Sequence, residues 1–266
     1  MGMSKSKPLL ACNYSPQLME LMEQNRVEVD WIKMGRWDVF PEEFAVARPV
    51  RPVLLHCLPH AGRASFDDIP WDALNAAIRD CGSPHIALHL MALATDWDTL
   101  PDSDEAVIER MVEGVMQWKA KMEVPLLLEN VPYYGHRGTL RCATDPEVIA
   151  SICDRCEVDL LLDVAHLRVS AWHRREEPDA YLRALPLHRV REIHTNGPFL
   201  DPDEGLRDRH FEMQDVDYEL LREALTLTSP GFVSLEYGGT GPKMEWRSDI
   251  AALERQLVRL RQVVVS

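Results

Sequence analysis

LLLEN at residues 126–130 and LLLDV at residues 160–164 carry the strongest fold signal in this chain. Each is a run of leucines that leads into an acidic residue, and neither alternates between apolar and polar positions. Runs that are apolar on both faces are typical of parallel strands, which helices cover on both sides. The two stretches therefore predict strands of a parallel sheet with polar groups at their ends.

Six more runs of strand length occur along the chain, with amphipathic helical segments between them. Ser15-Pro16 and Asp145-Pro146 are typical of helix starts. Eight strands, each followed by a helix, within 266 residues favour a single (β/α)₈ barrel, a TIM barrel, over residues 1–266. A doubly wound open sheet is the alternative, but no glycine-rich phosphate-binding motif follows a strand. The predicted strands are residues 8–13, 29–34, 52–57, 86–90, 125–130, 159–164, 190–194 and 232–237, and the predicted helices include residues 104–122, 178–185, 217–227 and 248–264.

The composition is that of a globular enzyme with an acidic surface. The formal net charge is −14, from 43 acidic and 29 basic side chains. This charge argues against a nucleic-acid partner, because such binding depends on basic side chains. No apolar stretch approaches the roughly 20 residues of a membrane span. The six cysteines are too sparse for a disulfide scaffold, so we expect a cytoplasmic protein. Residues 1–7 are expected to be disordered or derived from a tag.

Residue types that bind metals stand at or just beyond the ends of six successive predicted strands. In a (β/α)₈ barrel the carboxyl ends of the strands meet at one face, where active sites lie. One histidine or acid at a strand end is more often a hydrogen-bonded core residue. Burying many of them is costly unless they are paired or bind a metal. The candidate metal ligands are His56, His89, Glu129, Asp163, His166, His194, Asp208, His210 and Glu236.

Nine such residues predict a centre of two or three metal ions. Imidazole suits iron, zinc and manganese, and carboxylates bridge ions and balance their charge. Glu129 is the expected bridge. His60 lies in a loop at the same face and is expected to contact the ligands or the substrate. His85 and His188 precede strands, at the opposite face, and are expected to be structural.

The order of these residues resembles that of the xylose-isomerase-like superfamily, which includes the endonuclease IV type of DNA-repair enzyme. Seven stretches resemble one family within it more closely, the multinuclear non-heme iron-dependent oxidative enzymes. The best-known members of that family act in methanobactin biosynthesis and peptide-cysteine processing. Its most specific motifs here are ENVPYY (129–134) and LLLDV followed by VSA (160–171). The seven stretches are VLLHCLPHAG (53–62), IALHL (86–90), LLLENVPYYG (126–135), LLLDVAHLRVSAW (160–172), REIHTNGP (191–198), RDRH (207–210) and SLEYGG (234–239).

The resemblance implies an iron- and O₂-dependent enzyme that modifies a cysteine of a ribosomally synthesised peptide, by heterocycle formation or by excision of the β-carbon. It implies that the nine residues bind two or three iron ions, with zinc or manganese as the alternative. Glu129, Asp163 and His166 are then catalytic, and Asn130 and Tyr133 hydrogen-bond to ligands. It further implies a heterodimer with a small partner protein that binds the leader of the peptide.

Two positions depart from the pattern of the family. Ala165-His166 stands where many relatives have asparagine after the strand-end Asp-Val, which alters how a third metal ion would be held. Lys33 stands where many have glutamate. The competing interpretation is a metal-dependent hydrolase of the endonuclease IV type or a sugar isomerase of the same superfamily. The charge disfavours the endonuclease, and sugar isomerases use fewer histidines. A barrel that stores metal or carries a peptide is the third interpretation.

Overall fold

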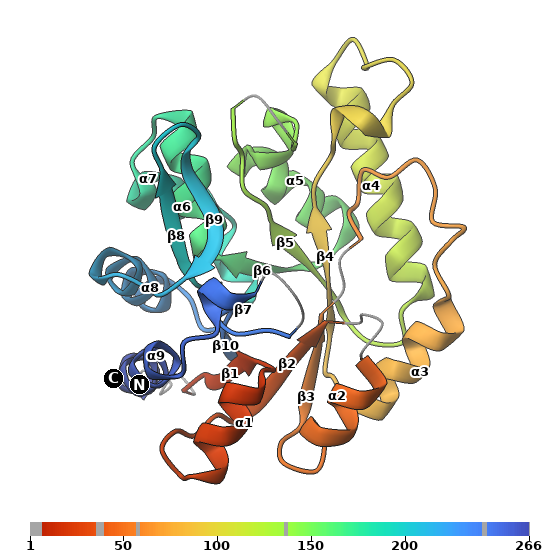
Figure 1. The fold of residues 1–266 in the computed structure, drawn as a ribbon. Coiled ribbons are helices and arrows are strands. Elements are labelled where there is room, and N and C mark those ends of the chain that lie inside the picture. The colour runs from red at the N-terminus through yellow and green to blue at the C-terminus, as the bar shows by residue number, and fades with distance from the viewer. Residues whose placement is uncertain (1–6, 36–39, 57–58, 136–137, 241–243, 266) are drawn as a thin grey trace, which may run out of the picture.

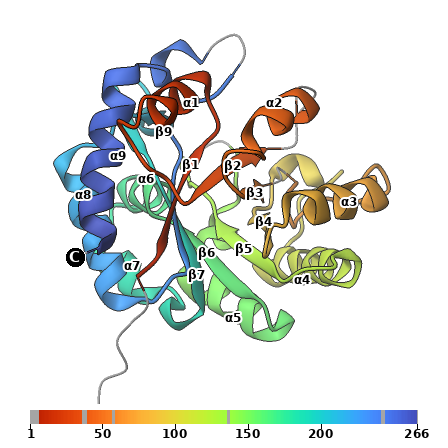
Figure 2. The same ribbon diagram turned by 90° about the horizontal axis from the view of Figure 1, so that it is seen from below.

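The computed structural model of the protein describes residues 7–35, 40–56, 59–135, 138–240 and 244–265. Within these ranges eight parallel strands form a barrel with helices around its outside (Figures 1 and 2). The prediction of a (β/α)₈ barrel is confirmed. The barrel strands are β1 (Leu9–Asn13), β2 (Trp31–Gly35), β3 (Val53–His56), β4 (Ile86–Leu90), β5 (Leu126–Asn130), β6 (Asp159–Asp163), β7 (Val190–Thr195) and β10 (Phe232–Leu235).

Two predictions fall partly on residues outside these ranges. Cys57, predicted as the last residue of the third strand, is one of them. Of residues 1–7, which were expected to be disordered or derived from a tag, residues 1–6 lie outside the described ranges. Lys7 is described, and its ammonium donates a hydrogen bond to the backbone oxygen of Val265 in the last helix.

Parallel ladders join the strands in the order β3-β2-β1-β10-β7-β6-β5-β4. No ladder pairs β3 with β4 among the described residues, and the segment that follows β3 hydrogen-bonds to β4 instead. The backbone N–H of His89 donates to the oxygen of Pro59 at 3.3 Å, and the N–H of Ala61 donates to the oxygen of His89 at 3.0 Å. Residues 59–61 therefore close the described part of the barrel beside a predicted ligand.

Two helices begin at the predicted starts Ser15-Pro16 and Asp145-Pro146, although the Asp145 side chain forms no capping hydrogen bond. The Ser15 hydroxyl accepts the N–H of Leu18 at 3.1 Å, and Asp163 caps α6 at the end of β6. None of the described helices combines the length and apolar character that a bilayer-spanning segment needs. The helices are α1 (Pro16–Glu23), α2 (Phe40–Ala47), α3 (Trp71–Cys81), α4 (Asp104–Lys121), α5 (Pro146–Cys156), α6 (Val164–Arg174), α7 (Pro178–Ala184), α8 (Asp215–Leu227) and α9 (Ile250–Val265), with short 3₁₀ turns at Ala94–Asp96, Arg141–Thr144, Leu187–Arg189 and Glu245–Arg247.

The segment after β7 is a β-hairpin, although no strand is predicted between residues 194 and 232. Strands β8 (Gly197–Asp201) and β9 (Gly205–Phe211) pair antiparallel and stand beside α6 (Figure 1). Phe199 stacks on Phe211 with ring centroids 5.0 Å apart. The sequence signal is weak because β8 begins with Gly-Pro and because charged residues interrupt the apolar pattern of β9. The hairpin places Asp208 and His210 on β9.

Alternate residues of each strand face opposite sides of the barrel wall. Leu126 and Leu128 of β5 pack in the large core beneath the helices. Leu127 belongs instead to a small cluster inside the barrel, with Ala87 and Leu161. Because the side-chain period of a strand is two residues, the next inward position after each of these three residues is His89, Glu129 or Asp163. The fold thus directs those side chains to one end of the barrel interior.

Gly114 allows α4 to lie directly against the segment that closes the barrel. A Cβ at this position would lie 2.0 Å from the backbone oxygen of Ala61. We expect Gly114→Ala to destabilise the protein by about 1–3 kcal/mol, because overpacking displaces backbone, although alanine is the better helix former. Urea unfolding measures this change. Gln117→Ala, at an exposed position of the same helix, is the control and should be near neutral. Equal stability of the two variants would contradict the close approach.

Candidate metal centre

Strand register brings the predicted ligands to one level at the carboxyl end of the barrel. His89 pairs with Glu129 across β4 and β5, and Asp163 pairs with His194 across β6 and β7. Asp163 and His194 are completely buried. A cavity of about 650 Å³ opens at this end. Its lining includes seven predicted ligands: His56, His89, Glu129, His166, Asp208, His210 and Glu236.

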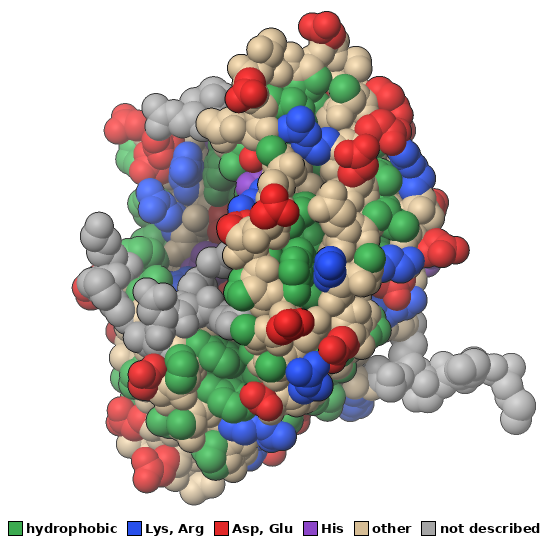
Figure 3. Space-filling model, turned by 90° about the vertical axis from the view of Figure 1, so that its right-hand side faces the viewer, with side chains coloured by type: hydrophobic (Ala, Val, Ile, Leu, Met, Phe, Trp, Pro, Cys, Tyr) green, Lys and Arg blue, Asp and Glu red, His purple; other side chains and the backbone are tan. Residues whose placement is uncertain are grey.

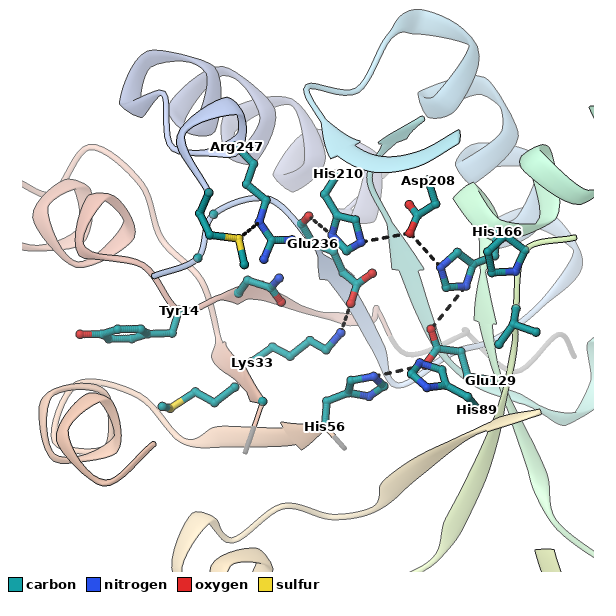
Figure 4. Close-up of a pocket in the computed structure, with 18 of the residues that line it drawn as sticks. Tyr14, Lys33, His56, His89, Glu129, His166, Asp208, His210, Glu236 and Arg247 are labelled. Carbon is teal, nitrogen blue, oxygen red and sulfur yellow. Dashed lines mark hydrogen bonds and ion pairs between the residues drawn. The ribbon is translucent and has the colours of Figure 1, made fainter. Parts of the chain in front are cut away.

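The carboxylate of Glu129 lies at the centre of these side chains (Figure 4). Its Oε2 atom is 3.4 Å from Nε2 of His56 and 3.3 Å from Nε2 of His89. Its Oε1 atom is 3.6 Å from Nδ1 of both His166 and His194. Each oxygen therefore faces a different pair of histidines.

A second concentration of polar atoms lies between β6 and the hairpin. Asp163 accepts the backbone N–H of His166 through Oδ1 at 2.7 Å, and its Oδ2 is 3.7 Å from Nδ1 of the same histidine. Oδ2 of Asp208 lies 3.3 Å from Nε2 of His166 and 3.2 Å from Nε2 of His210. The backbone of His210 has a φ of 54°. This conformation is uncommon outside glycine and occurs often at functional sites.

Three histidines of the site have one ring nitrogen held by an acceptor. The backbone oxygen of Asn130 lies 2.9 Å from Nδ1 of His166, and the backbone oxygen of Glu236 lies 2.8 Å from Nδ1 of His210. Oε1 of Glu192 lies 3.0 Å from Nε2 of His194. Histidines that bind metals usually donate their other N–H to a carbonyl or carboxylate, which fixes the tautomer and the ring orientation. The second nitrogen of each ring faces carboxylates of the site.

Three carboxylate oxygens of the site have no hydrogen-bond partner among the described residues. They are Oε2 of Glu129, Oδ2 of Asp163 and Oδ1 of Asp208, all buried. A buried carboxylate oxygen without a partner is costly, and a metal ion would satisfy it. Imidazole and carboxylate together suit transition metals. The residues present therefore fit a metal centre.

Three sets of side chains offer ligand atoms that lie within 4.8 Å of one another. The first ligand group is His56, His89 and Glu129; the second is Glu129, Asp163 and His166; the third is Asp163, His194 and Glu236. Glu129 is shared by the first two groups, and Asp163 is shared by the last two. Shared carboxylates of this kind are suited to a multinuclear centre.

The electrostatics of the site favour positive charge between the carboxylates. Burial raises the pKa of Asp163 to about 6, with neighbouring carboxylates adding to the rise and His166 opposing it. Burial disfavours the charged form of His166, but Asp163 and Asp208 outweigh it and hold the pKa of His166 well above its usual range. Burial also disfavours ionised Glu129, but His89 and His56 outweigh it and hold its pKa well below the usual range. These opposed shifts are typical of functional sites.

The outer part of the cavity is lined mainly by apolar and aromatic side chains. Tyr14, Met34, Met91, Tyr134 and Met244 contribute to it. Charged groups are interspersed on the outer face that Figure 3 shows, and histidine side chains are visible in a hollow toward the left of that view. The cavity therefore combines an apolar entrance with polar atoms at its base.

Two residues predicted beside the ligands form hydrogen bonds with other groups among the described residues. Nε2 of His60 lies 3.0 Å from both carboxylate oxygens of Asp96, and His60 is not among the residues that line the cavity. The Tyr133 hydroxyl donates to the oxygen of Gly135 at 3.2 Å. The next residue, Tyr134, lines the cavity instead. Because the regular strand ends at Asn130, strand alternation no longer indicates which tyrosine turns inward.

Asn130 occupies the position that the sequence analysis expects, beside the ligands. Its Nδ2 donates to the backbone oxygen of Asp163 at 2.9 Å, and its Oδ1 accepts the N–H of Asp163 at 2.8 Å. Its own backbone oxygen accepts Nδ1–H of His166. One asparagine thus joins the end of β5 to two predicted ligands on β6 and α6.

Glu192, a buried glutamate next to the site, is not among the residues predicted from the sequence. Glu192 accepts the Ser234 hydroxyl at 2.6 Å and contacts Nε2 of His85 at 2.6 Å, in addition to His194. His85, which was expected to be structural, is buried against the carboxylate of Glu192. The signal for Glu192 is its place two residues before His194, on the same side of β7.

Lys33 also belongs to the site, although the sequence analysis notes it only as a departure. It is buried on β2 and forms an ion pair with Glu236 (Figure 4). Its position between the apolar residues Ile32 and Met34 of a predicted strand is the signal that could have identified it.

Comparison with known proteins identifies related sequences over most of the chain. Residues 14–257 match the family described as RiPP precursor modification enzyme MbnB/TglH/ChrH. A UPF0276 protein of Shewanella amazonensis is 30% identical over 133 residues, 49% of this chain and 46% of the relative. The UPF0276 protein Anae109_1558 of Anaeromyxobacter is 30% identical over 172 residues, 64% of this chain and 56% of the relative. The chain thus spans about half the length of the curated relatives it matches.

Solved structures with similar folds are more distant in sequence. D-psicose 3-epimerase of Clostridium cellulolyticum, solved with D-tagatose, has a TM-score of 0.59 and 15% identity, over 96% of this chain and 99% of that chain. The TTHB071 protein of Thermus thermophilus, from a crystal soaked with ZnCl₂, has a TM-score of 0.51 and 18% identity, over 97% and 98%. At this identity the likeness concerns the barrel fold alone.

Proposed function

This chain belongs to the MbnB/TglH/ChrH family of RiPP precursor modification enzymes, and from that premise we propose that it oxidatively modifies a cysteine of a ribosomally synthesised peptide with iron and O₂. RiPP denotes a ribosomally synthesised and post-translationally modified peptide. The single observation that carries the proposal is the group of histidines around Glu129, whose buried Oε2 has no hydrogen-bond partner among the described residues.

The donor set supports a transition metal over a hard cation such as magnesium. The first ligand group has two imidazoles for one carboxylate, and the second has one imidazole for two carboxylates. Such mixed nitrogen and oxygen donors suit iron, and thiolate substrates bind to such ions. Bound iron would supply the redox chemistry with O₂. Zinc or manganese in the same ligands is the alternative.

The protein's own residues hold the donors in place and enclose the reacting end of the peptide. Asn130 and Glu192 fix the orientation of ligands from below. A cavity of about 650 Å³ lies within the usual range for small-molecule and cofactor sites, and is large enough for one or two residues of a peptide. Its apolar entrance, with Tyr14 and Tyr134, would exclude water from a cysteine at the base.

We further propose that a small partner protein binds the leader of the peptide and pairs with this chain. The cavity is open at the carboxyl end of the barrel. A flexible peptide that binds only through a short segment would bind weakly, because the entropy cost of ordering it offsets much of the interaction energy. A partner that holds the leader raises the effective concentration of the cysteine at the site. The net charge of −14 favours a partner or peptide of basic character.

Co-expression of the chain with a neighbouring small gene and a cysteine-bearing precursor gene tests the proposal. Mass spectrometry of the peptide should show a mass change confined to one cysteine. The change should require both iron and O₂, because neither the side chains nor the peptide alone supplies an oxidant. Anaerobic expression, and purified enzyme treated with an iron chelator, are the controls. An unmodified peptide, together with nicking of abasic DNA by the zinc-loaded chain, would favour a hydrolase of the endonuclease IV type.

A further inference from the structure

Lys33 places its ammonium group within the third ligand group. Its side chain is 4% exposed and forms an ion pair with Oε1 of Glu236. Its Nζ also lies 3.3 Å from Nδ1 of His194. Glu236 and His194 are two of the three members of that group. Figure 4 shows the lysine side chain reaching the carboxylate of Glu236, and only β1 separates β2 from β10 in the sheet.

The hydrogen-bond network beneath the site determines which nitrogen of His194 faces the lysine. Nε2 of His194 lies 3.0 Å from Oε1 of Glu192, and Glu192 is itself held by Ser234 and His85. With its hydrogen on Nε2, His194 presents the lone pair of Nδ1 to the ammonium. A carboxylate that fixes the tautomer in this way also occurs behind histidines that bind metals.

A metal ion and the ammonium would occupy the same space. Nδ1 of His194 and Oε1 of Glu236 are 3.4 Å apart, and Nζ contacts both. An ion bound to both atoms would lie about 2 Å from each, within the volume of the ammonium. It would also need the lone pairs that already accept hydrogen bonds from Lys33. The two cations therefore exclude each other.

The first two ligand groups differ from the third in this respect. Among the described residues, the ion-pair partners of Glu129 and Asp163 are histidines, not lysine or arginine. One oxygen of each carboxylate has no hydrogen-bond partner in that part of the chain. Burying a carboxylate requires a compensating charge or hydrogen bonds. Lys33 supplies a partner for Glu236 in the third group, whereas Oε2 of Glu129 and Oδ2 of Asp163 still lack one among the described residues.

We propose that the Lys33 ammonium is the resident cation of the third ligand group, so that this chain binds two metal ions rather than three. The inference rests on the proposed metal centre. The two ions belong to the first and second ligand groups and share Glu129. Lys33 is a positioning residue, which keeps Glu236 and His194 in place and limits the metal content of the site.

Counting bound iron tests the proposal without an activity assay. Each purified chain is loaded anaerobically with excess ferrous iron, desalted, and analysed for iron and protein. We expect two ions in the wild type and three in Lys33→Met, which has similar length and no charge. Lys119→Met, which removes a surface lysine of α4 beside Glu157, is the matched control and should bind two. In crystals of Lys33→Met, an anomalous iron peak should appear between His194 and Glu236.

A second variant serves if Lys33→Met does not fold. Glu236→Gln keeps an oxygen that accepts from Lys33, and we expect it to retain two ions, because Glu236 binds none in the wild type. Loss of one ion in Glu236→Gln would overturn the proposal. So would three ions in the wild type, or two in a folded Lys33→Met. A wild-type chain that binds no iron would instead refute the metal centre itself, and this inference with it.

Discussion

A Glu129→Gln variant should lose both metal ions and all measurable peptide modification while it keeps its fold. Glutamine has the shape of glutamate but lacks the charge, and its amide nitrogen cannot bind a metal ion. Glu129 belongs to both the first and the second ligand group, and its two oxygens face different histidines. One substitution therefore removes a ligand from each ion.

The expected loss of metal affinity is more than about 100-fold, since losing only a hydrogen-bond partner of a ligand costs 10- to 100-fold. Iron analysis after anaerobic loading and desalting should find almost no iron bound to the variant. Mass spectrometry of the co-expressed peptide gives the second readout. Glu123→Gln, at an exposed glutamate paired with Arg79, is the matched control and should match the wild type. Full iron content in Glu129→Gln would exclude Glu129 as the bridge.

Asn130→Ala should weaken both the fold and the metal centre. The variant leaves the backbone N–H and oxygen of Asp163 without the two side-chain partners they have at 2.8 and 2.9 Å. Each unsatisfied buried group costs about 1–3 kcal/mol, so we expect destabilisation of about 2–4 kcal/mol. Because Asp163 would then shift, iron should bind roughly 10–100-fold more weakly. Urea unfolding of the apo chain and iron titration measure the two effects separately.

Asn75 of α3 offers a matched control for this variant. Its Nδ2 donates to the backbone oxygen of Lys121 at 2.9 Å, and its Oδ1 accepts the N–H of Glu123 at 3.2 Å. Asn75 is buried but does not line the cavity. Asn75→Ala should therefore lose similar stability and bind iron normally. Normal iron binding by both variants would show that Asn130 contributes to folding alone.

The barrel, and the position of its site at the carboxyl ends of the strands, follow from local features of the chain. The run at residues 125–130 predicts β5 to within one residue of Leu126–Asn130, because a buried parallel strand needs apolar side chains on both faces. Ser15 predicts the start of α1 because its hydroxyl caps the helix. Parallel strands in register then place His89 beside Glu129 and Asp163 beside His194. Residue type and strand order were sufficient for this part.

Pairings across the barrel could not be predicted in the same way. Lys33 meets Glu236 across 203 positions of sequence, and His85 meets Glu192 across 107. The period of two shows which face of a strand a residue occupies, but not which side chain opposes it across the interior. That depends on how the strands are staggered when the barrel closes. The period also gives no indication for residues outside the predicted strands. His60 lies beside Asp96, Tyr134 rather than Tyr133 lines the cavity, and Asp208 and His210 reach the site from the hairpin.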